Sequence, residues 1–494
     1  MVRQMYPQTG AQAGTPVGKK PMGKKWMRLL AAGLVLSAWS AGAQPLPSAT
    51  PESVGVSSQR LERLHEGMQA FITRKDAGGI ITLLARDGKL IDLKAYGYQD
   101  VEKNLPMKTD TIFRIASMTK PITSVAIMML VEEGKIAITD PVSKFIPAFR
   151  ETRVAVKGEG NTVTLEPQKR QMTVRDLLSH RSGLSYGFAD SSPVGEAYRR
   201  GNVSDGLTTT DWNLAENIDR LAKAPLLSQP STEWHYSLGI DVLGRIVEVA
   251  SGRPFDVFLR DRIFTPLKMV DTGFDVPESK WSRFATVYSP EGPNGGIRPM
   301  KDPEQFGNTY MSPWAYYKAP KKYFSGGAGL TSTITDYSRF AQMLLNGGEL
   351  DGVRLLSPKT IESMATSHTE DIPGSEGGPG SGFGLGFRVV TDLGESQMNG
   401  SVGMYGWSGI YGTNFWVDPK EKLIAIMMVQ KYPNPTVAGP FQTLTYQAIV
   451  GPPAPVPVRG IRSRPTSSTS AARARSSALR SEASRRASSS VTWP

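Results

Sequence analysis

A serine and a lysine stand three residues apart at the start of an apolar, helix-forming stretch. The segment reads Ser117-Met118-Thr119-Lys120, and the stretch continues to Glu133, where Gly134 ends it. Residues i and i+3 of a helix lie on one face, so the hydroxyl and the ammonium should meet. A partly desolvated lysine can accept or relay the serine proton, which activates a weak nucleophile. The spacing therefore predicts a serine hydrolase with Ser117 as nucleophile and Lys120 as its activating partner.

This motif alone is weakly specific, because a helix-capping serine followed by a surface lysine has the same letters. Two later segments favour the chemical interpretation. Trp234-His235-Tyr236-Ser237-Leu238-Gly239 precedes an apolar helical stretch at 240–250. Gly406-Trp407-Ser408-Gly409-Ile410 lies among strand-like segments.

The order and spacing of these three segments resemble the serine β-lactamase and penicillin-binding protein superfamily, which uses S-x-x-K, then Y-x-N or S-D-N, then K-T-G. The resemblance is strongest to class C β-lactamases and to the β-lactamase-like carboxylesterases called family VIII. It implies an α+β fold of the β-lactamase/transpeptidase type, with an antiparallel sheet flanked by terminal helices and an inserted, mostly helical domain. Supporting segments are F-R-I-A at 113–116, L-L-S-H-R-S-G-L at 177–184 and G-G-A-G-L at 326–330.

The resemblance implies a role for each matching residue. Ser117 would be acylated, and Lys120 would hold its proton network. Tyr236 would act as general base for Ser117 and general acid for the leaving group, because a nearby ammonium would lower its pKa from about 10. The backbone N–H groups of Ser117 and Ile410 would form the oxyanion hole, where one donor contributes about 3–4 kcal/mol. Water or another acceptor would then release the acyl group.

Two positions depart from the β-lactamase pattern and point to the substrate. Leu238 replaces an asparagine that helps to recognise the acylamide side chain of a lactam. Trp407-Ser408-Gly409 replaces Lys-Thr-Gly, whose lysine contributes positive charge toward a substrate carboxylate. Both changes should make the pocket more apolar, with Leu238, Trp407, Ser408, Gly409 and Ile410 as its substrate-binding residues. Family VIII esterases resemble this chain at both positions, with Y-S-L and a third motif that begins with tryptophan.

The sequence therefore favours a carboxylesterase that cleaves short-chain acyl esters, with a small-molecule ester as its partner. A β-lactamase, a DD-peptidase or an acyltransferase would use the same Ser-Lys-Tyr site. A non-enzymatic ligand-binding relative would not need all three residues. The physiological ester, the acyl length, the acceptor and the oligomeric state do not follow from the sequence.

Other candidate residues fit catalysis less well. Ser185 lies in a G-x-S-x-G motif, but the nucleophile elbow of α/β-hydrolases needs a strand before the serine and a helix after it. Here a helical patch precedes the motif and loop residues follow, so a loop is predicted. His235 adjoins Tyr236 and should point to the opposite face of an extended segment. We expect His180 and His368 to be structural.

Composition excludes several classes of site. The chain has no cysteine, so it forms no disulfide, thiolate zinc site or cysteine nucleophile. Its four histidines have no metal-binding spacing, so neither a metal nor a cofactor is expected. The net charge is +12, but residues 1–43 carry +6 and residues 452–494 carry +7. The core between them carries −1, which gives no basis for a nucleic-acid partner.

The two ends have compositions unlike the core. Basic residues, the apolar run 29–38 and an A-x-A pattern at 41–43 predict a signal peptide at 1–43, although translation could begin at Met22 or Met27. The protein is then periplasmic or secreted, with no stable membrane anchor after cleavage. The Pro/Ser/Arg-rich tail 452–494 is predicted to be disordered.

Between the ends, hydrophobic periodicity outlines the domains. Helices are expected at 58–74, 119–133, 174–179, 240–250 and 441–450, a hairpin at 79–98, and strands at 385–390, 413–417 and 423–429. We therefore expect a sheet domain from 44–134 and 321–451, and a mostly helical domain from 135–320. A cleft between two such parts is a common place for a site.

Overall fold

The computed structural model describes residues 44–158, 162–292, 295–318, 320–372, 378–434 and 436–453. The signal peptide expected at 1–43 and the predicted tail from 454 onward lie outside these residues. Within the described residues, no helix combines the length and apolar character needed to cross a membrane.

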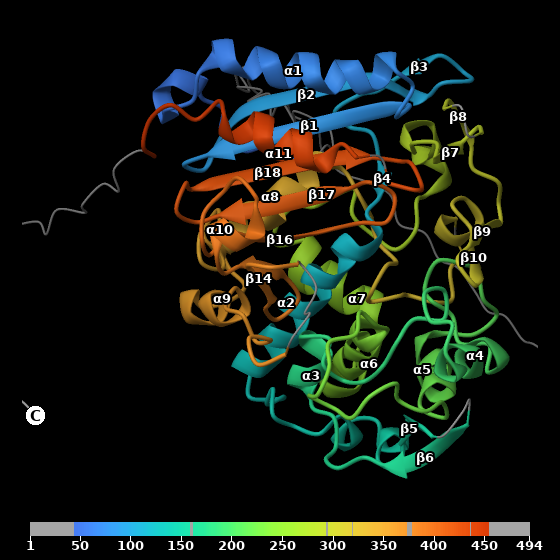
Figure 1. Ribbon diagram of the computed structural model, residues 1–494. Coiled ribbons are helices and arrows are strands. Elements are labelled where there is room, and N and C mark those ends of the chain that lie inside the picture. Colours follow the sequence, from blue (N-terminus) through green and yellow to red (C-terminus); the bar gives the residue numbers. More distant parts are fainter. Residues whose placement is uncertain are drawn as a thin grey trace, which may run out of the picture.

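An eight-stranded antiparallel sheet forms the frame of the protein (Figure 1). Its order is β14-β15-β16-β17-β18-β1-β2-β3, so strands from the two ends of the core meet at its centre. There β1 pairs with β18 along seven consecutive positions, from Ile80 opposite Val429 to Arg86 opposite Leu423. The strands are β1 (Gly79–Arg86), β2 (Lys89–Asp100), β3 (Leu105–Pro106), β14 (Ser381–Phe383), β15 (Arg388–Val390), β16 (Tyr405–Ser408), β17 (Asn414–Asp418) and β18 (Leu423–Val429).

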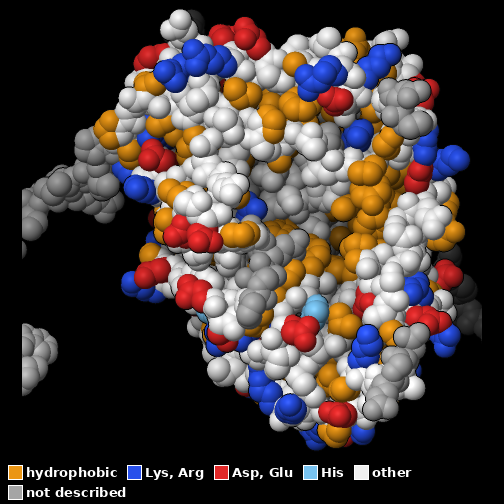
Figure 2. Space-filling view, in the orientation of Figure 1, with side chains coloured by type: hydrophobic (Ala, Val, Ile, Leu, Met, Phe, Trp, Pro, Cys, Tyr) orange, Lys and Arg blue, Asp and Glu red, His pale blue; other side chains and the backbone are white. Residues whose placement is uncertain are grey.

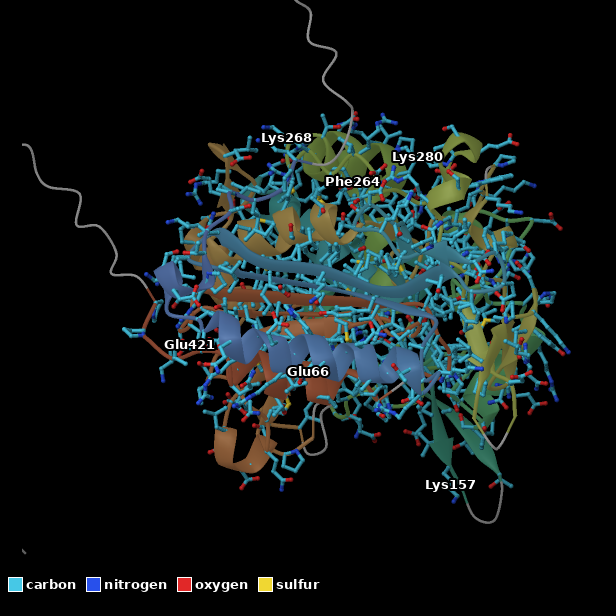
Figure 3. The ribbon with its side chains drawn as sticks, turned by 90° about the horizontal axis from the view of Figure 1, so that it is seen from above. Glu66, Lys157, Phe264, Lys268, Lys280 and Glu421 are labelled. Atoms are coloured by element: carbon cyan, nitrogen blue, oxygen red, sulfur yellow. The ribbon has the colours of Figure 1, made fainter. Side chains whose placement is uncertain are left out.

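Two helices cover the outer face of the sheet, α1 (Ser58–Thr73) and α11 (Ala438–Tyr446). The apolar residues of α1 recur at helical spacing and are buried, while Glu66 faces solvent. Figure 3 shows α1, with Glu66 labelled, lying along this face of the sheet. Trp416 of β17 contacts Phe441 of α11 with ring centroids 5.2 Å apart, which fixes α11 against the strands.

The inner face packs against α2 (Thr119–Glu132) and α8 (Ile334–Leu345). Residues 119–130 of α2 are buried, because the helix lies in the core beneath the sheet and packs against α6 (Gly239–Ser251). The remaining helices of the described chain are α3 (Val174–Leu178), α4 (Pro193–Arg200), α5 (Leu214–Leu221), α7 (Phe255–Leu259), α9 (Pro358–Met364) and α10 (Leu393–Ser396).

Several short hairpins accompany these helices. Segment 135–320, expected to be mostly helical, also contains β5 (Arg153–Lys157) with β6 (Val163–Pro167), β7 (Tyr288–Pro290) with β8 (Ile297–Pro299), and β9 (Glu304–Phe306) with β10 (Thr309–Met311). Figure 3 shows Lys157 at the far end of β5, away from the sheet. Outside this segment, β4 (Phe113–Arg114) pairs with β11 (Thr331–Ser332), and β12 (Glu349–Leu350) with β13 (Val353–Arg354).

Two predicted boundaries were wrong. The strand expected at 385–390 begins only at Arg388, because Gly386 turns the chain with φ of 98° and donates its N–H to the Leu178 carbonyl instead of a strand. The closing helix expected at 441–450 spans Ala438–Tyr446. Pro440 lies in its first turn, where the missing N–H is tolerated, so the helix starts earlier than the apolar pattern suggested.

A buried arginine holds the strand that leads to the predicted nucleophile. Arg114 is fully buried, and its guanidinium donates to the carbonyls of Ala285 and Pro313 and to the side chain of Gln430. It also lies 3.6 Å from the ring centre of Phe284. Burial lowers the pKa of Arg114 to about 10, so the group still carries its charge at neutral pH. Four distant segments are thereby connected just before residue 117.

Replacing Arg114 with methionine keeps most of the side-chain volume but leaves these buried acceptors without a donor. We expect Arg114→Met to lower the free energy of unfolding by about 3 kcal/mol or more, measured by urea denaturation. Arg63→Met on the exposed surface of α1 is the control and should change stability little. Equal stability of the two variants would contradict this account of Arg114.

Candidate active site

Ser117 is presented by a tight turn at the start of α2. The chain forms a 3₁₀ turn over Ala116–Met118 and continues directly into the helix. Ala116 has a φ of 41°, a left-handed conformation that is unfavourable for a residue with a Cβ. Within residues 111–130, all of which the structure describes, Ser117 is the one residue that is not buried. The strained turn therefore exposes a single hydroxyl on an otherwise buried segment.

Lys120 lies directly beneath this hydroxyl with 1% of its surface exposed. Its Nζ is 3.2 Å from Ser117 Oγ and donates to the Gly327 carbonyl at 2.8 Å. The ammonium also lies 4.4 Å from the ring centre of Tyr236 and 5.4 Å from that of Tyr186. A buried cation requires such polar and aromatic partners, and here they direct it toward the serine.

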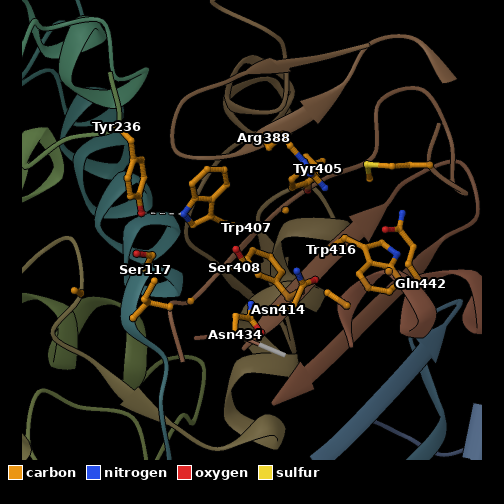
Figure 4. A pocket seen from close by; sticks show the side chains of 18 of the residues that line it. Ser117, Tyr236, Arg388, Tyr405, Trp407, Ser408, Asn414, Trp416, Asn434 and Gln442 are labelled. Carbon is orange, nitrogen blue, oxygen red and sulfur yellow. Dashed lines mark hydrogen bonds between the residues drawn. The ribbon is translucent and has the colours of Figure 1, made fainter. Parts of the chain in front are cut away.

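Tyr236 reaches the same place from the loop before α6. Its phenolic oxygen accepts a hydrogen bond of 3.3 Å from Nε1 of Trp407, on β16 (Figure 4). The rings of His180 and Tyr186 pack against the Tyr236 ring with centroids 4.8 and 5.4 Å away. The predicted triad of Ser117, Lys120 and Tyr236 is thus brought together from distant segments. Trp407, expected as an apolar wall, also contributes a polar contact.

The end of β16 packs tightly on the segment before Ser117. A Cβ on Gly409 would lie 2.4 Å from the Ile115 carbonyl oxygen and 2.3 Å from Thr413 Oγ1, so a larger residue would push the hairpin away. Thr413 Oγ1 also donates to the Ile115 carbonyl at 3.3 Å. This close approach brings Ile410, the predicted second oxyanion donor, beside Ser117, and both residues line one cavity.

That cavity has a volume of about 590 Å³, within the range of about 300–1,000 Å³ typical of small-molecule sites. Figure 2 shows the hollow in this face of the protein, with hydrophobic side chains along its walls. Of the predicted site residues, the cavity is lined by Ser117, Tyr236, Trp407, Ser408, Gly409 and Ile410.

Leu238 is a correction to the predicted site. Its side chain is completely buried in the core and is not among the residues that line the cavity. The residue precedes the first turn of α6, and its N–H donates to the Ser185 carbonyl, which turns the side chain into the core. Compared with the asparagine of β-lactamases, leucine at this position offers a substrate no polar group. It also forms no wall of the cavity.

Three residues near Lys120 were missed by sequence reasoning. A Cβ on Gly327 would lie 2.5 Å from Asp241 Oδ2, 3.0 Å from the Tyr186 hydroxyl and 3.4 Å from Lys120 Nζ. The three polar groups therefore converge on one glycine, which no larger residue could replace without a shift. Gly327 belongs to the G-G-A-G-L segment, but neither spacing nor periodicity connects Asp241 or Tyr186 with the lysine.

Asp241 supplies a negative charge close to the buried ammonium. It is fully buried and accepts a hydrogen bond of 2.7 Å from the Tyr323 hydroxyl. Burial raises the pKa of Asp241, whereas hydrogen bonds from Tyr323 and Ser325 and the charge of Lys120 act in the opposite direction. The carboxylate and the ammonium thus offset part of each other's desolvation.

A second buried carboxylate, Asp205, lies in the cavity wall. It accepts hydrogen bonds from the backbone of Gly187 and from Thr309. Burial raises the pKa of Asp205 to about 6, and the nearby charge of Asp241 acts in the same direction. These bonds hold the loop that carries Phe188 against β10, which shapes the cavity wall.

The alternative residues lie elsewhere. Ser185 is in a loop, as predicted, with 6% of its surface exposed, and it does not line the cavity. His235 pairs with Glu233 at 2.9 Å. His180 is fully buried behind the Tyr236 ring, and burial lowers its pKa well below the ordinary value. Over the described residues, no cluster of three or more His, Asp or Glu side chains could hold a metal ion.

Sequence comparisons with known proteins indicate the family to which this chain belongs. The Beta-lactamase family model matches residues 64–443. Protein Rv1367c of Mycobacterium tuberculosis is 36% identical over 385 residues, covering 75% of this chain and 91% of that protein. Esterase EstB of Burkholderia gladioli is 34% identical over 357 residues, covering 71% and 85%.

A comparison with solved structures indicates the same family. EstCE1, described as a hydrolase with promiscuous acyltransferase activity, superposes with a TM-score of 0.68 at 28% identity, covering 79% of this chain and 98% of its own. The fold of the β-lactamase/transpeptidase type, expected from the motifs, is thereby confirmed. The chain belongs to the β-lactamase family and is a serine hydrolase with esterase relatives.

Proposed function

We propose that this protein is a carboxylesterase that cleaves short-chain acyl esters through an acyl-enzyme on Ser117. The observation that carries the proposal is the isolated Ser117 hydroxyl, 3.2 Å from Lys120 Nζ, in a cavity shared with Tyr236. The likeness to Esterase EstB and to EstCE1 supports ester hydrolysis. The signal-like sequence at 1–43 supports export to the periplasm or the medium.

The geometry suggests how each group acts in the first half of the reaction. Tyr236, with Lys120 beneath its ring, accepts the Ser117 proton while Oγ attacks the ester carbonyl carbon. The N–H donated by Trp407 stabilises negative charge on the phenolic oxygen. The carbonyl oxygen becomes an oxyanion held by the backbone N–H groups of Ser117 and Ile410. The alkoxy C–O bond then breaks, and Tyr236 returns the proton to the departing alcohol.

The second half mirrors the first. Water gives a proton to Tyr236 and attacks the acyl carbon. The bond to Ser117 Oγ then breaks, Tyr236 returns the proton to Oγ, and the acid is released. An alcohol in place of water would give a new ester. The described acyltransferase activity of EstCE1 favours testing this second acceptor.

The pocket chemistry supports a neutral ester over a carboxylated lactam. Trp407 places an indole where β-lactamases have a lysine, and its N–H is directed to Tyr236. Phe188, Phe306 and Leu207 form apolar walls of the same cavity. Asp205, the acid among the residues that line the cavity, would repel a substrate carboxylate.

The identity of the nucleophile is tested by comparing two serines. Ser117→Ala should lower kcat for p-nitrophenyl butyrate by about a thousandfold or more, because the covalent step is lost. Ser185→Ala is the matched control and should retain most of the activity. Mass spectrometry after a fluorophosphonate probe should find the adduct on Ser117. An adduct on Ser185 would refute the mechanism, and rapid cephalosporin turnover with little ester hydrolysis would favour a β-lactamase.

The Trp407 hydrogen bond gives a second test. Trp407→Phe keeps an aromatic wall but removes the N–H donor, so kcat should fall about 10- to 100-fold, as for a hydrogen bond to a charged group. KM should change by about twofold or less, because the loss affects the transition state. Trp281→Phe, which removes an indole donor bound to the Val276 carbonyl far from the site, is the control. A rise in KM with unchanged kcat would show that Trp407 only contacts the substrate and does not stabilise the transition state.

The negative charge of Asp241 gives a third test. Asp241→Asn keeps the shape but removes the counter-charge of Lys120, so kcat/KM should fall about tenfold or more. Asp205→Asn alters another buried carboxylate, whose hydrogen bonds hold a loop, and this variant should affect activity less. Thermal unfolding of both variants separates loss of fold from loss of activity. Equal activity of the two variants would show that Asp241 does not act through Lys120.

A further inference from the structure

The active-site cavity extends over both faces of β16. On the inner face it contains Ser117 and Tyr236 and is walled by Phe188, Leu207 and Phe306. We call the part on the opposite face the outer lobe, which is lined by Arg388, Met404, Asn414, Trp416, Gly439 and Gln442. Figure 4 shows Ser117 and Tyr236 on one side of Trp407 and Ser408, and Arg388, Trp416 and Gln442 on the other.

Core packing supports this division into two faces. Tyr405 and Phe415 pack into the core that contains α2, whereas Met404 and Trp416 pack into the core between the sheet and α1 with α11. Side chains alternate along a strand, so Gly406 and Ser408 belong to the outer face and Trp407 to the inner. The outer lobe is therefore continuous with the catalytic site but lies behind the strand that carries Trp407.

The edge of β16 connects the two parts. β15 pairs with β16 only at Tyr405 and Gly406, so no strand of the sheet lies beside Trp407 and Ser408 on that side. A Cβ on Gly406 would lie 2.2 Å from the Phe415 carbonyl oxygen, so a side chain is excluded there. The space on that side of Gly406 is filled by the backbone of β17, while Arg388 lies opposite Gly406 on β15. One cavity still reaches both faces of β16, because its lining includes Ser117 and Tyr236 as well as Arg388 and Trp416.

The proton path decides which arm of an ester turns this way. The departing alcohol oxygen receives its proton from Tyr236, whose hydroxyl is bonded to Trp407. The carbonyl oxygen is held further along the chain, at Ile410. The departing alcohol oxygen would thus lie beside Tyr236 and its partner Trp407, and Figure 4 shows Trp407 between Ser117 and the residues of the outer lobe. On this ground the alcohol arm is assigned to the outer lobe, and the acyl arm to the walls at Phe188 and Phe306.

The lining of the outer lobe indicates the kind of alcohol. Trp416, which stacks on Tyr446 with centroids 6.2 Å apart, and Met404 line the lobe with the apolar atoms that their 5% and 2% exposure leaves accessible. Asn414, Gln442 and Arg388 place polar side chains around it, and the Gln442 amide donates to the Asn399 carbonyl. The acid among the cavity-lining residues, Asp205, lies on the inner face next to Phe188. This surface suits a flat apolar body with oxygen acceptors.

We propose that the outer lobe binds the alcohol part of the substrate, and that this alcohol is an extended, flat apolar group bearing oxygen acceptors. The proposal rests on the proposed esterase function and adds the direction and the chemistry of one substrate arm. Short-chain acyl groups then occupy the inner face, and selectivity for the alcohol arises behind β16.

The test fills the outer lobe without touching the catalytic residues. Gly439 lies in α11, and an added Cβ would meet nothing within 4 Å, so Gly439→Phe can be accommodated and should project into the lobe. Thr443→Phe adds the same ring to an exposed position of the same helix and is the matched control. Both variants are compared with the wild type on 4-methylumbelliferyl butyrate, a flat bicyclic ester with oxygen acceptors, and on ethyl butyrate.

Gly439→Phe should lower kcat/KM for the bicyclic ester about tenfold or more, mainly through KM, because the ring loses its apolar contact. Ethyl butyrate hydrolysis should change by about twofold or less, since its alcohol does not reach the lobe. The acyl-length profile from acetate to octanoate on the bicyclic alcohol should keep its shape. Thr443→Phe should match the wild type on every substrate.

Two results would overturn the proposal. A changed acyl-length profile with an unchanged ratio between the two butyrates would place the acyl arm in the outer lobe. No effect of Gly439→Phe on either series would show that substrate does not enter it. Wild-type protein that hydrolyses none of these esters would instead refute the proposed esterase function, whatever the variants do.

Discussion

The burial of one ammonium group determines most of the site. Lys120 has 1% of its surface exposed, and a cation removed from water to this degree must be surrounded by acceptors. The surrounding groups are the Ser117 hydroxyl, the Gly327 carbonyl, two tyrosine rings and the nearby Asp241 carboxylate. They come from the 3₁₀ turn before α2, from α6, from the loops before α4 and α6, and from the segment before β11. Distant segments of the fold are therefore connected at the candidate active site.

The candidate catalytic residues could be selected from the sequence because they lie in short motifs that follow one another in a set order. Ser117 and Lys120 are one helical turn apart, and Tyr236 and Trp407 lie in segments with family-specific letters. The helices and strands near them followed from periodicity, as in α1, β1 and α2. The strand expected at 385–390 was too long, because the turn at Gly386 depends on a partner, Leu178, that is distant in the chain.

The less predictable features depend on contacts between distant segments. Asp241 and Tyr186 carry no signature, and their closeness to Lys120 arises only when three segments converge on Gly327. Leu238 was assigned to the pocket from its place in a motif, but the start of α6 turns its side chain into the core. Trp407 was read as apolar, although its N–H reaches Tyr236. Such directions of side chains follow from packing, which a linear pattern does not encode.

The pairing of β1 with β18 affects how the protein is made as well as its shape. These strands stand near opposite ends of the core and lie side by side at the centre of the sheet. During synthesis, the edge of β1 that pairs with β18 therefore stays unpaired until almost the whole core has been made. Ser117, the proposed nucleophile, and β16 likewise meet only at that late stage, so we expect partial chains to contain no assembled site. Enzymatic activity and completion of the sheet thus arise in the same folding event.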